Sequence, residues 1–369
     1  MLPLEGIVVA DLTSVVAGPL ATSILAEQGA RIVKIEPKAG DRARMLGPIA
    51  APGRSAVHAR LNAGKESAVL DLTQAEDVGT LLRIVAAADV LVHNYRPGVM
   101  ERLGLTLDRL RETRPDLIVA RITGFGQTGP LCGERAYDPI IQAEAGLTVP
   151  DASGEPRLIP QYVCDKVTGL YAAQAITAAL LARTRGRGAS MIDISMLEAA
   201  VAFGWMDAHQ EAVFAVPARP GPNIAAVYRP WPARDGWLVI VMVSDEEFAG
   251  FAAAIGAPDL PADERFADMP SRFHHWDAIR AAGEPHLAAM SVQEAARRLR
   301  AAGVPCGIVN SAEALTAHPQ LAANDFLERV GDAVLPAAVA RFDGGRTRSG
   351  PAPDLGEHSA KIRNEFSQG

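Results

Sequence analysis

Residues 6–11 (GIVVAD) and 31–36 (RIVKIE) are the two segments that decide the expected fold. Each is a short apolar run rich in β-branched residues, which is typical of a buried strand in a parallel sheet. Residues 19–28 lie between them and have the composition of a helix that Gly29 ends. The alternation continues with strand-like runs at residues 67–72, 89–93 and 116–122. It predicts βαβ units and an α/β fold with a doubly wound sheet.

Two further helices are predicted from the residues at their starts. Residues 73–87 begin with Thr73 as N-cap and carry Glu76 at the capping-box position. Residues 164–185 form an Ala-rich helix in which Asp165 has the commonest role of an Asp at a helix start, that of a cap. A carboxylate at that place also suits chemistry, because it stays ionised and the helix amides can hold an oxyanion. The local sequence leaves both roles of Asp165 open.

Composition divides the chain into a large and a small domain. Residues 191–195 are expected to form a strand, followed by a helix to residue 211. Residues 216–235 are rich in Pro, Arg and Gly, which is typical of a linker. The small α+β domain is expected to hold a strand at 237–243 and helices near 246–255 and 292–302, and a strand at 306–309 begins a return segment. The predicted units are a large domain (1–215), a small domain with its linkers (216–305) and the return segment (306–369).

Length, charge and cysteine use define the broad class of protein. With 369 residues, of which 49% are hydrophobic and 21% charged, the chain is expected to be a globular enzyme large enough for two domains. Its net charge of −7 argues against partners such as nucleic acid or a membrane surface, which need a basic face. Three cysteines without framework spacing suit a reducing compartment. The start of the chain has no signal-peptide pattern, and the apolar stretch 170–182 is too short to span a bilayer. We therefore expect a cytoplasmic protein.

The first βα turn tests whether this sheet binds a dinucleotide. A nicotinamide-binding domain would place G-x-G-x-x-G there, so that the backbone approaches a pyrophosphate. Residues 13–19 read TSVVAGP instead, with one glycine. A literal G-x-G-x-x-G occurs at residues 124–129, but it follows the wrong strand and Pro130 comes next. We interpret residues 124–129 as a tight loop that borders a site.

A basic run extends over residues 31–65. It carries eight basic side chains, namely Arg31, Lys34, Lys38, Arg42, Arg44, Arg54, Arg60 and Lys65, against two acids. A solvated loop is the usual explanation for such a run. Its position after the second strand, at the mouth of the sheet, favours a pocket for a polyanionic ligand such as a phosphorylated cofactor.

The sequence lacks the residue patterns of other catalytic classes. The eight histidines form no metal-ligand spacing, and no H-E-x-x-H or C-x-x-C occurs, so no metal site is expected. No G-x-S-x-G elbow supports a hydrolase triad. Cys164 lies among apolar residues, where a cysteine is usually inert core.

Taken together, these motifs resemble the family III CoA-transferases of the CaiB/BaiF type, in family order over nearly the whole chain. The segments that carry the resemblance are PLEGIVVADLT (3–13), AGP (17–19), GARIVKIEP (29–37), LNAGK (61–65), ADVLVHNYRPG (88–98), ERLGL (101–105), ITGFGQTGP (122–130), YDPIIQ (137–142), DKVTGLYA (165–172), AAGVPCGIVN (301–310) and LGEH (355–358).

The resemblance implies a fold, an assembly and a reaction. The fold is a Rossmann-like large domain joined by two linkers to a small domain, and two such chains interlock as a homodimer. The reaction is acyl-CoA:carboxylate CoA transfer, with Asp165 as the nucleophile and aspartyl anhydride and aspartyl-CoA thioester intermediates. No cofactor beyond coenzyme A or acyl-CoA, the substrate itself, is implied.

The resemblance also implies the residues of the site. The CoA contacts carried over are Ser14, Val15 and Ala17 on the adenine side, Lys38, Arg44, Lys65, Asn94, Arg102 and Arg135. Lys65, Arg102 and Arg135 suit the nucleotide phosphates. Tyr137 and Gly126 are expected in the acyl pocket, and Gly169 is a further candidate for an oxyanion or lid element.

Two departures from the family bear on the reaction. The racemase branch has a His just before the Asp that matches Asp138, whereas this chain has Tyr137. Because racemisation needs a second acid/base group, the change favours transfer over an α-methylacyl-CoA racemase or epimerase. The stretch from 219 to 223 has no glycine run of the kind that forms a lid in some members. A non-catalytic CoA-binding protein, in which Asp165 only caps its helix, is the alternative of a different class.

Overall fold

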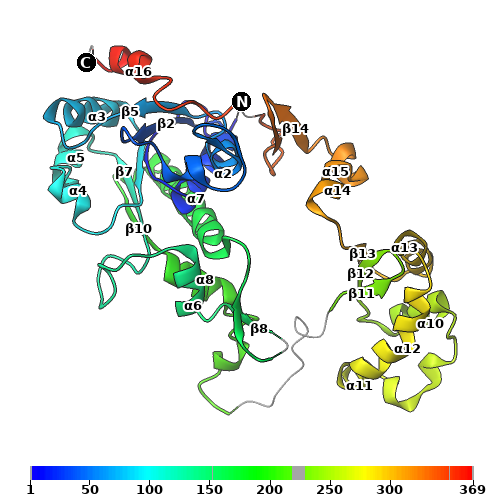
Figure 1. Cartoon of the computed structure of the whole chain (residues 1–369). Coiled ribbons are helices and arrows are strands. Elements are labelled where there is room, and N and C mark those ends of the chain that lie inside the picture. The colour runs from blue at the N-terminus through cyan, green and yellow to red at the C-terminus, as the bar shows by residue number, and fades with distance from the viewer. Residues whose placement is uncertain (1, 152, 218–228, 349, 368–369) are drawn as a thin grey trace. The chain divides into compact units, whose positions relative to one another are not determined.

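The computed structural model describes residues 2–151, 153–217, 229–348 and 350–367 (Figure 1). The chain forms two compact units, one made of Met1–His209 and Ala322–Gly369 and the other of Gln210–Leu321. The stretch 219–223, expected to lack a glycine-run lid, lies outside the described residues.

A six-stranded parallel sheet forms the centre of the large unit. Its strands lie in the order β10 (Met191–Ser195), β7 (Ile118–Thr123), β6 (Val90–His93), β1 (Val8–Leu12), β2 (Arg31–Glu36) and β5 (Glu66–Val69). From β1 the chain adds β2 and β5 on one side, then returns to add β6, β7 and β10 on the other. This sheet confirms the predicted doubly wound α/β fold, and strand order reverses between β1 and β6.

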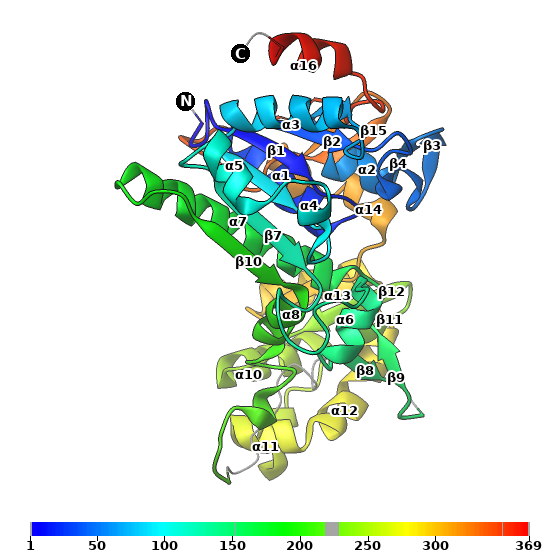
Figure 2. The ribbon, with the colours of Figure 1, turned by 90° about the vertical axis from the view of Figure 1, so that its left-hand side faces the viewer.

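Helices cover both faces of this sheet, because both faces are apolar (Figure 2). On one face α1 (Ala17–Glu27) and α7 (Val163–Thr184) pack against residues such as Val9 and Ile32. On the other, α3 (Ala75–Ala87), α5 (Leu107–Thr113) and α16 (Ser359–Glu365) pack against the alternate residues. The period of two along each strand divides its side chains between the two cores.

Two predicted helix starts are wrong. Helix α3 begins at Ala75 with Gln74 as its N-cap, because the Thr73 hydroxyl donates to Asp71 instead of capping the helix. Helix α7 begins at Val163 with Tyr162 as its N-cap, so Asp165 lies inside the first turn and does not cap it.

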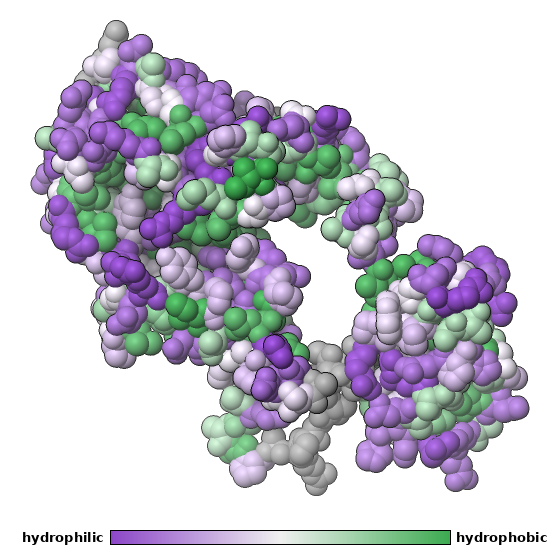
Figure 3. All heavy atoms as spheres, in the orientation of Figure 1, coloured by the Kyte–Doolittle hydropathy of each residue, from purple (hydrophilic) through white to green (hydrophobic). Residues whose placement is uncertain are grey.

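Shorter elements complete the large unit. The helices are α2 (Ala56–Leu61), α4 (Val99–Arg102), α6 (Asp138–Glu144) and α8 (Met196–Gly204), with a 3-10 turn at Arg42–Met45. The strand pairs are β3 (Ile49–Ala51) with β4 (Arg54–Ser55), β8 (Thr148–Pro150) with β9 (Pro156–Leu158), and β14 (Leu327–Val330) with β15 (Ala333–Pro336). An apolar groove lies between α2 and the β14–β15 hairpin, where Ile49 and Val334 are exposed and hydrophobic residues gather (Figure 3).

The small unit combines a three-stranded antiparallel sheet with helices. The sheet is β11 (Trp231–Ala233), β12 (Gly236–Ile240) and β13 (Cys306–Ile308). The helices are α10 (Asp245–Ile255), α11 (Met269–His274), α12 (Trp276–Ala288), α13 (Val292–Ala301) and α14 (Ala312–Thr316), with 3-10 turns at Gln210–Ala212, Leu260–Ala262 and Glu264–Phe266, and α15 (Pro319–Ala323) spans the boundary. Their core is rich in aromatic side chains, including Trp231, Phe251 and Trp276.

The boundaries of the small unit differ from the predicted ones. Strand β11 falls inside the expected linker 216–235, because Trp231 is fully buried in the core of the small unit. Strand β13 pairs with β12 and therefore belongs to the small unit, so the return begins after Leu321 and not at residue 306.

Candidate active site

A cavity of about 390 Å³ lies at the carboxyl edge of the parallel sheet. Segments that follow β1, β6 and β7 border it, together with the starts of α7 and α8. This is the point where strand order reverses, and open α/β sheets bind their ligands at such points. Seven of the predicted site residues line this cavity: Ser14, Val15, Ala17, Asn94, Arg135, Tyr137 and Asp165.

Asp165 owes its position to the contact between α7 and α1. Gly169, one turn further along α7, packs directly on α1, and a Cβ there would lie 2.8 Å from the Ala17 carbonyl oxygen. This close approach brings the first turn of α7 beside the N-terminus of α1. The backbone N–H of Asp165 donates to Asp138 Oδ2 at 2.9 Å, which leaves its own carboxylate to the cavity. Gly169 thus acts in the structure as a packing residue.

The carboxyl group of Asp165 is much more basic than an exposed one. Its partial burial and the nearby carboxylate of Asp138 raise its pKa to about 7, while a hydrogen bond from the Ala17 backbone N–H acts in the opposite direction. Asp138 is itself buried at the start of α6, where Gln142 donates to it. A strongly shifted pKa in a cavity is typical of a functional group. Asp165 therefore meets this criterion on geometry and on electrostatics.

Cys164, the neighbour of Asp165, is inert core as predicted. It is fully buried among apolar side chains of α6 and α8. Burial, together with the charges of Asp138 and Asp165, raises the pKa of its thiol to about 12. The thiolate that a cysteine nucleophile needs is therefore scarce at neutral pH.

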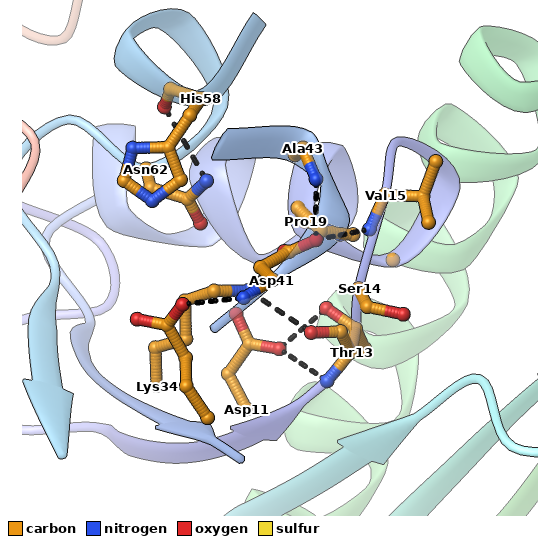
Figure 4. A network of polar contacts seen from close by, with 12 residues as sticks. Asp11, Thr13, Ser14, Val15, Pro19, Lys34, Asp41, Ala43, His58 and Asn62 are labelled. Carbon is orange, nitrogen blue, oxygen red and sulfur yellow. Dashed lines mark hydrogen bonds and ion pairs between the residues drawn. The ribbon is translucent and has the colours of Figure 1, made fainter. Parts of the chain in front are cut away.

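Side chains from outside the first βα turn hold its first three residues, 13–15. Asp11 accepts the N–H of Thr13 and Lys34 Nζ donates to the Thr13 carbonyl, both at 2.9 Å (Figure 4). Asn94 accepts the N–H of Ser14 at 3.0 Å and donates to its carbonyl at 2.8 Å. The carboxylate of Asp41 accepts the N–H of Val15 at 2.9 Å.

Most of the predicted basic run is engaged in ion pairs. Seven of its eight basic side chains lie within ion-pair distance of protein carboxylates: Arg31, Lys34, Lys38, Arg44, Arg54, Arg60 and Lys65. Among the described residues, only Arg42 of this run has no such partner, and it lines the cavity. The structure therefore accounts for most of the basic run without a ligand.

Arg44 and Lys65, both predicted to contact CoA, point into the protein. Arg44 forms a two-pronged contact with Glu36, at 2.7 and 2.9 Å. Lys65 Nζ lies 3.1 Å from Asp11 and also donates to Thr22 and to the Pro19 carbonyl. Together with Lys34 and Asp41 these residues form one buried set of charges. We call it the ionic network: Asp11, Lys34, Glu36, Asp41, Arg44 and Lys65.

The remaining predicted residues do not line this cavity. Lys38 borders a neighbouring cavity of about 440 Å³, and Tyr95 lines both cavities. Arg102 is exposed at the end of α4. The N–H of Gly126 donates to the Thr123 hydroxyl at 3.1 Å, and in its loop it is Gly124 that lines the cavity.

The structure adds cavity residues that the sequence analysis did not select, notably Arg42, Arg96 and Tyr95. Arg42 belongs to the basic run, and Arg96 and Tyr95 lie in the segment 88–98. Spacing does not distinguish Arg42 from Arg44. The 3-10 turn Arg42–Met45 sends Arg42 to the cavity, where its guanidinium lies 3.4 Å from the Tyr137 hydroxyl, and Arg44 to the interior.

The part of the chain that the structure describes holds neither a cluster of metal ligands nor a helix suited to cross a bilayer. Between residues 2 and 367, leaving out those that the structure does not describe, no three His, Cys, Asp or Glu side chains come together as metal ligands. In the same ranges no helix combines the length and the apolar character that crossing a bilayer requires.

A doubly wound α/β unit with a ligand-sized cavity at its switch point is typical of an enzyme, and comparison with known proteins identifies the family. The family described as CoA-transferase family III matches residues 4–359. Acetyl-CoA:oxalate CoA-transferase from Acetobacter aceti is 39% identical, over 99% of this chain and 96% of that protein. Succinate–glutarate CoA-transferase from Agrobacterium fabrum is 32% identical, over 99% and 96%. The crystal structure of a CaiB/BaiF family protein from Brucella suis matches with a TM-score of 0.88 at 31% identity and covers 99% of each chain. The chain belongs to CoA-transferase family III and is a CoA-transferase.

Proposed function

We propose that this enzyme transfers CoA from an acyl-CoA to a carboxylate acceptor through covalent intermediates on Asp165. The observation that carries the proposal is the carboxyl group of Asp165. It borders the cavity at the switch point, has a pKa of about 7, and receives a hydrogen bond from the Ala17 N–H. An ionised carboxylate of this basicity is a better nucleophile than an ordinary aspartate.

The proposed reaction conserves the energy of the thioester. The Asp165 carboxylate attacks the thioester carbonyl, the C–S bond breaks, and an aspartyl acyl anhydride and a CoA thiolate form. The thiolate then attacks the aspartyl carbonyl, which releases the donor carboxylate and leaves an aspartyl-CoA thioester. The acceptor carboxylate displaces the thiolate to give a second anhydride. The thiolate finally attacks the acceptor acyl group, so that a new acyl-CoA leaves and Asp165 is free again.

The protein groups around Asp165 support this chemistry. The N–H of Ala17 lies where negative charge develops on a carbonyl oxygen, and preorganised donors of this kind stabilise such charge. The positive end of the α1 dipole also lies there. No side-chain hydrogen bond caps this helix at Val16. Water must be excluded at each step, since it would hydrolyse the intermediates.

We propose that CoA lies across the two neighbouring cavities that share Tyr95. Lys38 and Arg102 would hold the nucleotide phosphates at the outer end, and Arg135 would bind further in. Ser14, Val15 and Ala17, expected on the adenine side, border the cavity of Asp165 together with Asn94, so we propose their contacts near the thioester instead. Tyr137 would lie at the acyl group, with Gly126 in the adjacent loop. Arg44 and Lys65 would support the site from the interior, without touching the ligand.

We also propose the homodimer and the cytoplasmic location that the sequence suggests. Support for the dimer comes from α7, which packs one face on α1 and on the sheet yet exposes Leu170, Tyr171 and Leu181. An apolar helix surface of this kind is typical of an interface with another chain.

Covalent trapping tests the reaction directly. Incubation of the enzyme with acyl-CoA donors and hydroxylamine should convert an anhydride or thioester at Asp165 into a hydroxamate, which peptide mass analysis detects. Asp165→Ala is the control and should give no adduct, lose turnover by roughly 10³-fold or more, and retain CoA binding. A panel of carboxylate acceptors should then identify the substrate.

The alternatives give different results in the same assays. A racemase would exchange the Cα hydrogen of its acyl-CoA with deuterium without a second substrate. A protein that only binds CoA would leave every acyl-CoA unchanged and show no hydroxamate. Either result, with CoA affinity intact, would contradict the proposed transfer.

A further inference from the structure

Val15 has a backbone conformation that its side chain disfavours. Its φ is +71°, in the left-handed region, whereas β-branched residues strongly prefer negative φ. Two other non-glycine residues within the described ranges have positive φ, Asp325 and Asp343, and Asp tolerates that region well. A strained Val persists only where its surroundings impose the conformation, and such strain often occurs at functional sites.

The carboxylate of Asp41 holds the backbone N–H of Val15. Asp41 Oδ1 accepts the N–H of Val15 at 2.9 Å and the N–H of Ala43 at 2.8 Å, while Oδ2 lies 2.8 Å from Lys34 Nζ (Figure 4). Asp41 is itself fixed, because it is almost fully buried and its own N–H donates to Glu36. The ionic network thus ends in a carboxylate that holds the strained residue.

Strain at Val15 determines where α1 begins. The N–H groups of Thr13, Ser14 and Val15 are taken up by Asp11, Asn94 and Asp41. Helix α1 starts two residues later, at Ala17, which borders the cavity together with Asp165 and whose carbonyl oxygen packs against Gly169 of α7. If Val15 relaxed to negative φ, the chain would enter α1 in another direction and the start of α1 would shift relative to Asp165.

We propose that Asp41 is a positioning residue for the transfer reaction, since it holds Val15 in the left-handed conformation that places the start of α1 beside Asp165. The proposal rests on the proposed function of Asp165. Asp41 acts through the backbone and touches no substrate, so it affects the rate of chemistry more than the affinity for acyl-CoA.

Glycine at residue 15 provides the decisive experiment, because glycine adopts positive φ without a clamp. Asp41→Asn keeps the shape of the side chain but leaves one acceptor oxygen in place of two, so it cannot serve both Lys34 and the N–H groups of Val15 and Ala43. We expect it to lower kcat by roughly 10- to 100-fold and to change KM for acyl-CoA by less than about threefold. Adding Val15→Gly should return kcat to within about threefold of the Val15→Gly enzyme, whatever that substitution alone does to KM.

Asp11→Asn is the matched control. Asp11 belongs to the same network but holds Thr13, not Val15. Its loss should also slow the enzyme, yet Val15→Gly should not rescue it. If Asp41→Asn leaves kcat unchanged, or if Val15→Gly rescues both variants or neither, the positioning role is wrong. If Asp41→Asn alone does not fold, the double variant is compared with Val15→Gly. A kcat of the double variant more than about tenfold below that of Val15→Gly overturns the positioning role of Asp41.

A second measurement does not depend on turnover. The change in melting temperature that Val15→Gly causes should be more stabilising in the wild-type enzyme than in Asp41→Asn. In Asp41→Asn, Val15 has already relaxed, so glycine relieves no strain there. Equal changes in both backgrounds would contradict the clamp. A hydroxamate that forms at Asp165 while these comparisons fail would refute the clamp alone, whereas the absence of any hydroxamate would refute the proposed function.

Discussion

Asp11 and Asp165 are aspartates at the same edge of one sheet, and the protein holds them at opposite ends of the carboxyl pKa range. Burial would raise the pKa of Asp11, but Lys65 and Lys34, with the hydroxyls of Thr13 and Thr22, lower it to about 2. Asp165 has no cation in that position, so burial and Asp138 raise its pKa to about 7. Asp11 belongs to the ionic network, which stabilises its charged form. Asp165 belongs to the cavity, which disfavours its charged form.

The difference separates the charges that hold the backbone from the charges left for a ligand. Inside the ionic network each carboxylate meets a cation or backbone N–H groups, because an uncompensated buried charge is costly. In the cavity, Asp165 faces another carboxylate, and Arg42 has no carboxylate partner among the described residues. Polar groups that the fold leaves unpaired are those that a substrate can use.

Removal of Lys65 tests the ionic network and should have the largest effect on stability. Lys65→Met keeps the length of the side chain but leaves Asp11 with one cation fewer in the interior. We expect the free energy of unfolding to fall by about 3–5 kcal/mol, measured by chemical denaturation. Lys38→Met is the matched control, since the Lys38 side chain is 79% exposed and lies 3.6 Å from Asp71. It should change stability by less than about 0.5 kcal/mol. Similar losses in both variants would remove the distinction between the network and surface charge.

Asp165→Asn should have a smaller effect, of the opposite sign. The pKa of Asp165 is raised from 3.8 to about 7 on folding, so its protonated form favours the folded state. That stability is present below pH 3.8 and is lost as the pH rises to 7, because the buried group must then ionise. The inactive Asn variant avoids this loss. Its stability gain should be near zero at pH 4, grow to roughly 1–3 kcal/mol at pH 7, and stay constant above.

Melting temperatures of the two proteins at several pH values measure this gain. A pH-independent difference, or a less stable Asn variant at pH 8, would mean that Asp165 ionises as easily as an exposed carboxyl. The raised pKa would then be absent from the free enzyme.

The sequence predicted the parallel sheet, the long helix α7 and seven of the residues that line the cavity. Strand-like runs and their spacing are local signals, and a carboxyl edge gathers the residues that follow the strands. Asp165 could be placed at the start of α7, but the sequence did not show that Tyr162 is the cap, because Asp at a helix start usually caps. Gly169 was expected to be an oxyanion or lid element, and the contact between α1 and α7 shows it as a packing residue instead.

Charge pairing is what the sequence could not reveal. Lys65 pairs with Asp11, 54 residues earlier, and Arg44 with Glu36 across a loop. Such partners are set by the packed sheet and have no fixed spacing. The basic run therefore predicted a polyanion pocket, although the fold uses most of its cations within the protein. The strain at Val15 was hidden for the same reason, since its cause is the distant carboxylate of Asp41.

Arg42 offers the finest test of the comparison, because it shares the basic run with Arg44 but faces the cavity. Arg42→Ala should raise KM about tenfold for one of the two anionic substrates, the acyl-CoA or the carboxylate acceptor. This corresponds to about 1.4 kcal/mol of binding free energy. Its stability should change by less than about 0.5 kcal/mol, since Arg42 has no buried partner. Arg54→Ala is the matched control, because Arg54 belongs to the same run and forms an exposed ion pair with Asp332. It should leave KM and stability as they are. If Arg42→Ala loses stability but keeps its KM, Arg42 has a structural role like that of Arg44. The basic run would then supply no cation for a substrate in the cavity.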